Sequence, residues 1–295
     1  MLRLRPVSYI TILLTLLYSS CKKFEKAPIP SYIYVKPYKL TTANNNSQGE
    51  ASAKIVDAWI DVNGISIGSF GIPSTVPIIQ TGKVKLTLKA GIINSGQDEQ
   101  RIVYPFYTID TFSINLQAER VDTVEGKVNY VNGLKFPFIE DFSFASNKFS
   151  IYGKKNQDSI LIMNDNKGWK ENNNYGKIQF SDSTTDVIEL RMNTPDLHGF
   201  DLPAARSKVY FEIDYKSNVD FAIGMTKYLP GEGETGYAIL QVSQKENWNK
   251  IYLDLTNEFI KLTSDYKFKI SIGINKKTDG ITDFNFDNLK LIYFE

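Results

Sequence analysis

Strict alternation of apolar and polar residues is the feature of this sequence that most restricts its fold. Residues 83–89 read Lys-Val-Lys-Leu-Thr-Leu-Lys, and residues 209–215 alternate in the same way. Successive side chains of a strand point to opposite faces, so a period of two indicates a strand with one buried face. Burying many such faces requires pairs of stacked sheets. The sequence therefore predicts an all-β chain of β-sandwiches, with a helical pattern only at residues 257–264.

The first 21 residues have the composition of a targeting segment. Arg3 and Arg5 are followed by an apolar run at residues 9–17, which is too short to cross a bilayer core of ~30 Å. The run ends at small residues that lead into Cys21, the single cysteine of the chain. One cysteine excludes an internal disulfide framework, so the stability of the fold must come from burial.

Residues 18–21, Tyr-Ser-Ser-Cys, resemble the lipobox of bacterial lipoproteins, although Tyr18 stands where Leu is usual. The resemblance implies cleavage before Cys21 and a covalent lipid on its thiol. Several acyl chains on one residue would give stable membrane anchoring. An ordinary secretory signal with a chance cysteine, or an uncut signal anchor, is the alternative.

The remaining residues divide into a tether and two β-rich blocks. Residues 22–31 are polar and proline-containing, which predicts a tether. Residues 32–133 show repeated short strands and an Asn63-Gly64 hairpin signal, which favour an Ig-like sandwich. Residues 134–295 predict a second sandwich.

Charge and histidine content exclude two function classes. The chain has 34 basic and 33 acidic residues, and removal of Arg3 and Arg5 with the leader leaves 32 basic residues. A nearly neutral protein is not expected to bind nucleic acid by electrostatics. His198 is the only histidine, so it leaves little basis for a catalytic triad or a histidine-rich metal site. Glu212 and Asp214 partly match the paired-carboxylate strand of a glycosidase but lack the third acid, so we expect no enzyme.

Four segments of the second block carry a resemblance to a known fold. They are residues 139–142 (Ile-Glu-Asp-Phe), 209–218, 248–255 and 286–289 (Phe-Asp-Asn-Leu). Together they resemble the jelly-roll modules attached to bacterial surface proteins, including carbohydrate-binding modules and galactose-binding-like domains. The expected architecture is thus an N-terminal Ig-like β-sandwich followed by a jelly-roll β-sandwich. Such patterns mark a fold better than a ligand.

The resemblance implies candidate site residues. Jelly rolls of this kind often hold a structural Ca²⁺, and Glu140, Asp141 and Asp287 occupy the matching places; solvated acids at strand ends are the alternative. A glycan-binding site would need exposed aromatic rings. The candidates are Trp169, Tyr175, Tyr228 and Tyr237, and Trp169 could equally cap the sandwich.

The combined layout resembles outer-membrane lipoproteins of Bacteroidetes. This implies an anchor in the outer membrane and leaves two alternatives for the side, the cell surface and the periplasmic face. Because no aromatic binding strip emerges, the sequence favours an accessory or scaffold subunit of a transport, secretion or gliding complex that binds an outer-membrane protein. The alternative is a surface lipoprotein whose jelly roll binds carbohydrate.

Overall fold

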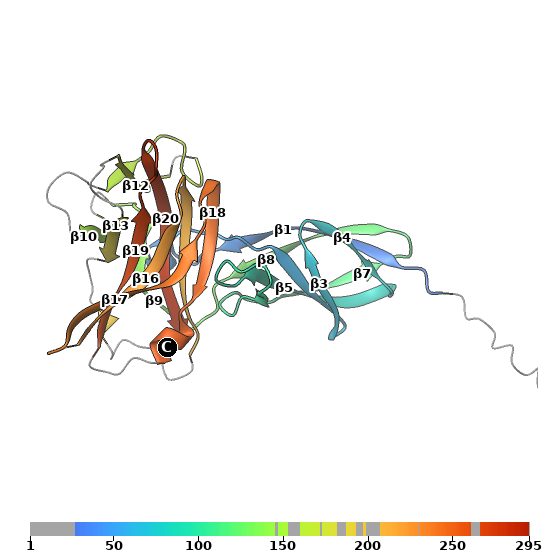
Figure 1. The fold of residues 1–295 in the computed structure, drawn as a ribbon. Coiled ribbons are helices and arrows are strands. Elements are labelled where there is room, and N and C mark those ends of the chain that lie inside the picture. Colours follow the sequence, from blue (N-terminus) through green and yellow to red (C-terminus); the bar gives the residue numbers. More distant parts are fainter. Residues whose placement is uncertain are drawn as a thin grey trace, which may run out of the picture.

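We describe the protein from a computed structural model. The structure describes residues 27–144, 147–152, 160–171, 173–181, 187–192, 197–198, 207–229, 231–260 and 266–294. Strands dominate these residues, which confirms the predicted all-β class. Figure 1 shows two sandwiches, with one end of the first against a face of the second, and with β1 beginning at the end of the first sandwich that points away from the second.

The first sandwich consists of two sheets. One has the strand order β4-β1-β8 and the other β3-β2-β5-β6, with β7 also paired to β5. The elements are β1 (Ser31–Thr41), α2 (Asn45–Gln48), β2 (Asp57–Val62), β3 (Ile65–Gly71), β4 (Ser74–Ile78), β5 (Gly82–Ile93), β6 (Arg101–Val103), β7 (Asp110–Leu116) and β8 (Val121–Asn129). Strands β1 and β8 run parallel, and the other pairs are antiparallel.

Local sequence explains this sandwich. On β5, Val84, Leu86 and Leu88 are buried and join one core, as their alternation predicts. Asn63 and Gly64 turn between β2 and β3 with φ of 51° and 80°. Both positions of a type I′ turn require positive φ, so the predicted hairpin is confirmed.

The second sandwich follows after residues 130–133. Its elements are β9 (Leu134–Glu140), β10 (Phe149–Tyr152), β11 (Leu161–Met163), β12 (Tyr175–Phe180), β13 (Val187–Met192), β14 (Leu197–His198), β15 (Val209–Ser217), β16 (Phe221–Leu229), β17 (Gly233–Val242), β18 (Lys245–Asp254), α3 (Thr256–Ile260), β19 (Lys267–Asn275) and β20 (Thr282–Phe294). The short helix α3 falls where the helical pattern predicted one.

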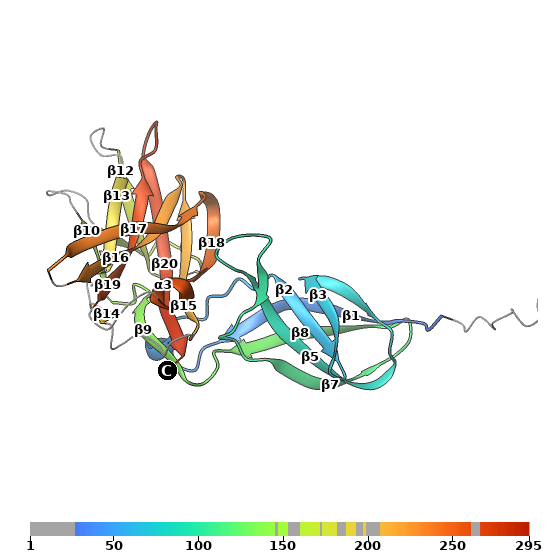
Figure 2. The same ribbon diagram turned by 60° about the horizontal axis from the view of Figure 1, so that its bottom comes forward.

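Two sheets enclose the core of the second sandwich. We call β11-β12-β20-β15-β18, with β9 on β20, the covered sheet, and β10-β13-β19-β16-β17, with β14 on β19, the open sheet. Alternate residues of each strand fill one core, such as Phe211 and Ile213 of β15 and Ile270 and Ile272 of β19. The first sandwich lies against the covered sheet, and the open sheet lies on the far side (Figures 1 and 2).

The two sheets differ in how their outer faces are covered. Every residue of β15 except Lys216 is buried, including the outward-facing Tyr210, Glu212 and Asp214. The outward residues of β13, by contrast, remain exposed or half-buried. The difference follows from the first sandwich, which covers one sheet only.

An aromatic cluster seals the junction. Tyr104 and Phe106 of the first sandwich lie edge-on to Tyr210 of the second, with ring centroids 5.1 and 5.5 Å apart. Phe106 also packs edge-on against Phe294. Edge-to-face aromatic pairs each stabilise by ~0.5–1.5 kcal/mol beyond their burial, so the junction is a packed interface and not a loose linker.

Candidate functional site

A buried polar network lies beneath the junction. Lys250 is 3.0 Å from Glu212 and 3.5 Å from Asp214, and all three side chains are nearly inaccessible. Tyr104 and Tyr130 of the first sandwich donate hydrogen bonds to Glu212. Burial opposes the charge of Lys250, but Asp214 and Glu212 outweigh it and raise the pKa of Lys250. The charges of the second sandwich are therefore satisfied partly by hydroxyls of the first.

A second lysine extends the network. Lys290 donates to the carbonyl of Glu50 at 2.6 Å and to the hydroxyl of Tyr130 at 3.3 Å. Burial lowers the pKa of Lys290 to about 8, while Glu212 opposes the shift. Ser52 of the first sandwich donates to the carboxylate of Asp214. A buried charge is tolerated when it is paired and hydrogen-bonded, so this network links the two sandwiches.

The burial of this network bears on whether Glu212 and Asp214 of β15 can act as a catalytic pair. Glu212 and Asp214 are 0% and 3% exposed, and both lie under the first sandwich. A glycosidase needs its carboxylates in contact with substrate. Neither residue can meet a substrate in this structure.

The predicted calcium ligands lie near one another but in different environments. Glu140 accepts hydrogen bonds from the backbone of Phe142 and Lys148, one on each oxygen, so the loop after β9 already uses its carboxylate. Burial raises the pKa of Asp287, and the negative charges of Asp214, Glu50 and Asp141 raise it further. The neighbouring Asn288 has a buried Oδ1 that finds no hydrogen-bond partner in the part of the chain that the structure describes. Among the described residues, however, no group of three or more His, Cys, Asp or Glu is placed to hold a metal.

The predicted aromatic residues divide between the two sheets. Trp169 and Tyr175 lie beside the covered sheet: Trp169 is half-buried, and Tyr175 is 2% exposed with its hydroxyl donating to Asp165. Trp248 at the start of the 248–255 segment lies half-buried with its ring edge-on to Tyr175. On the open sheet, Tyr237 is half-buried and donates to Glu258.

Tyr228 is the predicted aromatic residue that presents its ring to solvent. It stands near the end of β16, and 40% of its surface is exposed. Its cross-strand neighbours are Lys267 on β19 and Glu234 on β17. The outer face of the open sheet therefore presents an exposed aromatic ring between a lysine and a glutamate.

Small residues line the middle of this outer face. The register aligns Arg191, Ser271, Gly224 and Ala238 in one row across four strands. The next row aligns Glu189, Gly273 and Ala222. The outward side chains in the middle are short while those around them are long, and we call this outer face the trough.

Arg191 organises one side of the trough. Its guanidinium lies 3.3 Å from the ring centroid of Tyr152, whose ring is 52% exposed, and it forms ion pairs with Glu189 and Glu234. Strands β13 and β17 are three places apart, which is about 14 Å in a flat sheet. The 2.7 Å contact between Arg191 and Glu234 therefore links β13 to β17 across the outer face.

A pocket of about 200 Å³ lies beside Glu234, the ion-pair partner of Arg191. Its lining includes Thr226, Tyr228, Glu234, Lys267 and Lys269. The hydroxyl oxygen of Thr226 is buried without a hydrogen-bond partner among the described residues. An exposed ring beside carboxylate, ammonium and hydroxyl groups can bind a ligand that has both an apolar face and several hydroxyls.

Sequence reasoning found Tyr228 but missed Tyr152 and Arg191. These two residues are 39 positions apart and meet because β10 and β13 pair, with Tyr152 opposite Glu189. Only the register of the sheet brings them together, and no local motif encodes that register.

The leader and its cysteine lie outside the described residues. Cys21 and the targeting segment therefore stay a prediction of the sequence. The described part of the chain contains no helix with the length and apolar character to cross a membrane.

Comparisons with known proteins give similarities of fold only. No protein-family profile and no curated protein matches the chain. Among solved structures, carbohydrate-binding modules of the β-sandwich superfamily, described as promiscuous in specificity, align over 90% of this chain and 99% of their own, with 16% identity and a TM-score of 0.41.

Two further solved structures align with about half of the chain. A xylan-binding domain of carbohydrate-binding family 22 covers 53% of this chain and 93% of its own, with 10% identity and a TM-score of 0.38. The family 11 carbohydrate-binding module of a cellulosomal cellulase of Clostridium thermocellum has the same coverages and TM-score, with 16% identity. The chain is thus similar to β-sandwich carbohydrate-binding modules, and at these TM-scores the similarity assigns it neither a family nor a ligand.

Proposed function

We propose that this protein is a non-enzymatic, lipid-anchored envelope protein that binds carbohydrate in the trough of the open sheet. The observation that carries the proposal is the arrangement of two exposed rings, Tyr152 and Tyr228, and the half-buried, ion-paired Arg191 around a floor of small residues. Sugar rings present C–H faces to aromatic rings and hydroxyls to charged side chains. The trough offers both kinds of contact on a sheet that the first sandwich leaves open.

Carbohydrate binding is the alternative function that the sequence analysis gave after the scaffold role. No feature of the described residues specifically favours a scaffold role, whereas the trough favours a ligand. The paired carboxylates of β15 are buried, which supports a binding role over a catalytic one.

The arrangement of the sandwiches suits an anchored binding protein. Strand β1 begins at the end of the first sandwich that lies away from the second (Figure 1). A lipid on Cys21 would connect through residues 22–31 to that end. The open sheet would then be held far from the membrane, with the first sandwich as a spacer.

Replacing Tyr228 by alanine is expected to weaken glycan binding about tenfold, since truncating an aromatic anchor costs about 1–2 kcal/mol. The measurement is a screen on an array of neutral oligosaccharides, followed by calorimetric titration of the best ligand. Tyr34→Ala, on β1 of the first sandwich, is the matched control and should bind like the wild type. Failure of every array glycan to bind, or wild-type affinity for both Tyr228→Ala and Arg191→Met, would contradict the proposal.

A structural Ca²⁺ at Asp287 remains part of the proposal. Its support is the buried carboxylate of Asp287 near other acids, with the unpartnered Oδ1 of Asn288 beside it. A cation held at 100 times its Kd stabilises by about 2.7 kcal/mol, so EDTA is expected to lower the Tm by about 5–10 °C. Asp287→Asn should abolish the effect of EDTA, and the exposed Asp279→Asn should retain it. A Tm that does not respond to EDTA would remove calcium from the proposal.

A further inference from the structure

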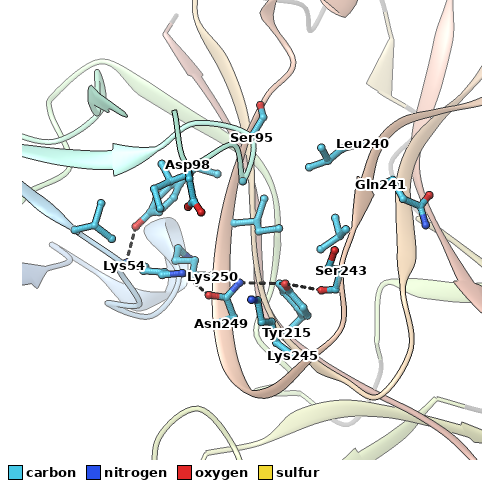
Figure 3. Close-up of a pocket in the computed structure, with 16 residues that line it drawn as sticks. Lys54, Ser95, Asp98, Tyr215, Leu240, Gln241, Ser243, Lys245, Asn249 and Lys250 are labelled. Atoms are coloured by element: carbon cyan, nitrogen blue, oxygen red, sulfur yellow. Dashed lines mark hydrogen bonds between the residues drawn. The ribbon is translucent and has the colours of Figure 1, made fainter. Parts of the chain in front are cut away.

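A second pocket, of about 230 Å³, opens at the junction of the two sandwiches (Figure 3). Its walls come from the segment after α2, the loop after β5 and the β17–β18 hairpin. Figure 3 shows Lys54, Asn249, Tyr215 and Ser243 joined in a row by hydrogen bonds along one side of this pocket, with Lys245 beside them. The polar residues of its lining include Lys54, Asp98, Tyr215, Lys245 and Asn249. Domain junctions are a preferred location of ligand sites.

A chain of hydrogen bonds fixes the floor of this pocket. Lys54 donates to the side-chain carbonyl of Asn249, and the amide nitrogen of Asn249 donates to the hydroxyl of Tyr215 at 3.1 Å. That hydroxyl donates onward to the carbonyl of Ser243 at 3.0 Å. The backbone nitrogen of Lys54 also donates to the hydroxyl of Tyr252. The lysine is therefore positioned from both ends, and its ammonium has further protons for a ligand.

The electrostatics of the pocket favour an anion. Burial lowers the pKa of Lys54, and the positive charge of Lys245 lowers it further, against the opposing effect of Asp98. The ammonium groups of Lys54, from the first sandwich, and Lys245, from the second, thus line the pocket together with the carboxylate of Asp98. A bound oxyanion would relieve the repulsion between the two lysines and accept charge-assisted hydrogen bonds from them.

A neighbouring pocket shares one lining residue with the junction pocket. It has a volume of about 340 Å³, shares Lys245 with the junction pocket, and adds Lys167, Lys177 and Lys216. Lys177 is paired with Asp283 at 3.1 Å, and Asn218 and Asn285 supply amides. The two pockets together form a track of ammonium groups interspersed with carboxylates and amides.

The mixture of charges indicates which anion fits. A polyphosphate would be repelled by the carboxylates of Asp98, Glu246 and Asp283 that line the track. A uronic acid residue has one carboxylate and several hydroxyls. Lysines can donate hydrogen bonds to the carboxylate, carboxylate side chains can accept hydrogen bonds from the hydroxyls, and side-chain amides can do both. The junction pocket has room for roughly one such ring, and the neighbouring pocket has room for the next.

We propose that the junction pocket binds the carboxylate of a uronic acid residue through Lys54 and Lys245, and that the neighbouring pocket holds the adjoining residues of the same acidic oligosaccharide. This site lies beside the covered sheet and is separate from the trough of the open sheet. The protein then has two carbohydrate sites of different charge preference, and the second depends on contributions from both sandwiches.

Calorimetric titration of the full chain in detergent with trigalacturonate tests the proposal. The fully methyl-esterified trisaccharide is the uncharged control. Lys54→Met and the exposed Lys245→Met are each expected to weaken binding of trigalacturonate at least about tenfold, the loss expected for one charge-assisted hydrogen bond. Lys36→Met, an exposed lysine on β1, is the matched control and should leave the affinity unchanged. An unchanged melting temperature of Lys245→Met would show that the loss is not a loss of folding.

The two carbohydrate sites can fail independently. Tyr228→Ala should leave trigalacturonate binding intact; if it abolishes that binding, the ligand occupies the trough and the junction site is overturned. Equal binding of the charged and esterified trisaccharides, wild-type affinity in both lysine variants, or no binding of trigalacturonate at all would also overturn it. Binding of trigalacturonate without binding of any neutral glycan would support the junction site and contradict the trough.

Discussion

Replacing Lys250 by methionine is expected to lower the free energy of unfolding by about 3–5 kcal/mol, the cost of breaking a buried ion pair by removing one partner. The ammonium of Lys250 lies between Glu212 and Asp214, and the side chains of all three are 4% exposed or less. Methionine fills a similar volume but removes the ammonium that pairs with both carboxylates, and the nearby Lys290 is already engaged with Glu50 and Tyr130. A loss of this size is a large part of the 5–15 kcal/mol that stabilises a typical domain.

The control is an ion pair with similar geometry but greater exposure. Lys89 and Asp61 are 2.6 Å apart on the first sandwich, and their side chains are 30% and 14% exposed. Lys89→Met is expected to cost less than about 1 kcal/mol because solvent screens the pair. Equilibrium unfolding in urea measures both variants.

The double variant Lys250→Met, Glu212→Gln provides a further test. Neutralising one of the two carboxylates left by Lys250→Met should recover part of the lost stability, because the repulsion between Glu212 and Asp214 is then removed. A Lys250→Met protein as stable as Lys89→Met would mean that water reaches the network and that the sandwiches are not closed over it.

The alternation of apolar and polar residues predicted the strands and the cores. It could not predict which outer sheet face another part of the chain covers. On β15, the outward positions Tyr210, Glu212 and Asp214 follow the polar-out pattern of a solvated sheet face. They are nevertheless buried, because the first sandwich docks there. The partners that make this burial possible come from elsewhere: Lys250 from β18 and Tyr104 from the loop after β6. A one-dimensional pattern cannot distinguish such a face from a solvated one.

The candidate sites show the same limit. A tyrosine beside a glycine-rich polar loop is visible in a sequence, so Tyr228 could be selected in advance. The stacking of Arg191 on Tyr152 depends on the pairing of β10 with β13, and the approach of Lys54 to Lys245 depends on docking of the two sandwiches. Local chemistry can be read from the residues, whereas the meeting of distant strands requires the register and the interface.

Replacing Cys21 by serine is expected to move nearly all of the protein from the membrane fraction to the soluble fraction. The apolar run at residues 9–17 is too short to span a bilayer core of ~30 Å, so in the proposed function the anchoring comes from the lipid on Cys21. Each buried methylene of an acyl chain contributes ~0.8 kcal/mol, and serine cannot form the thioether that carries the chains. Fractionation and incorporation of labelled palmitate measure the two effects together.

The same experiment separates the three readings of the leader. Ser20→Ala keeps a small residue before the cysteine and should leave labelling and fractionation unchanged. Retention of Cys21→Ser in the membrane with an unshortened N-terminus would indicate a signal anchor. A soluble wild type without label would indicate an ordinary secretory signal. Either result would remove the membrane from the proposed function, while the trough and the junction pocket, which lie in the folded sandwiches, would remain as sites to test.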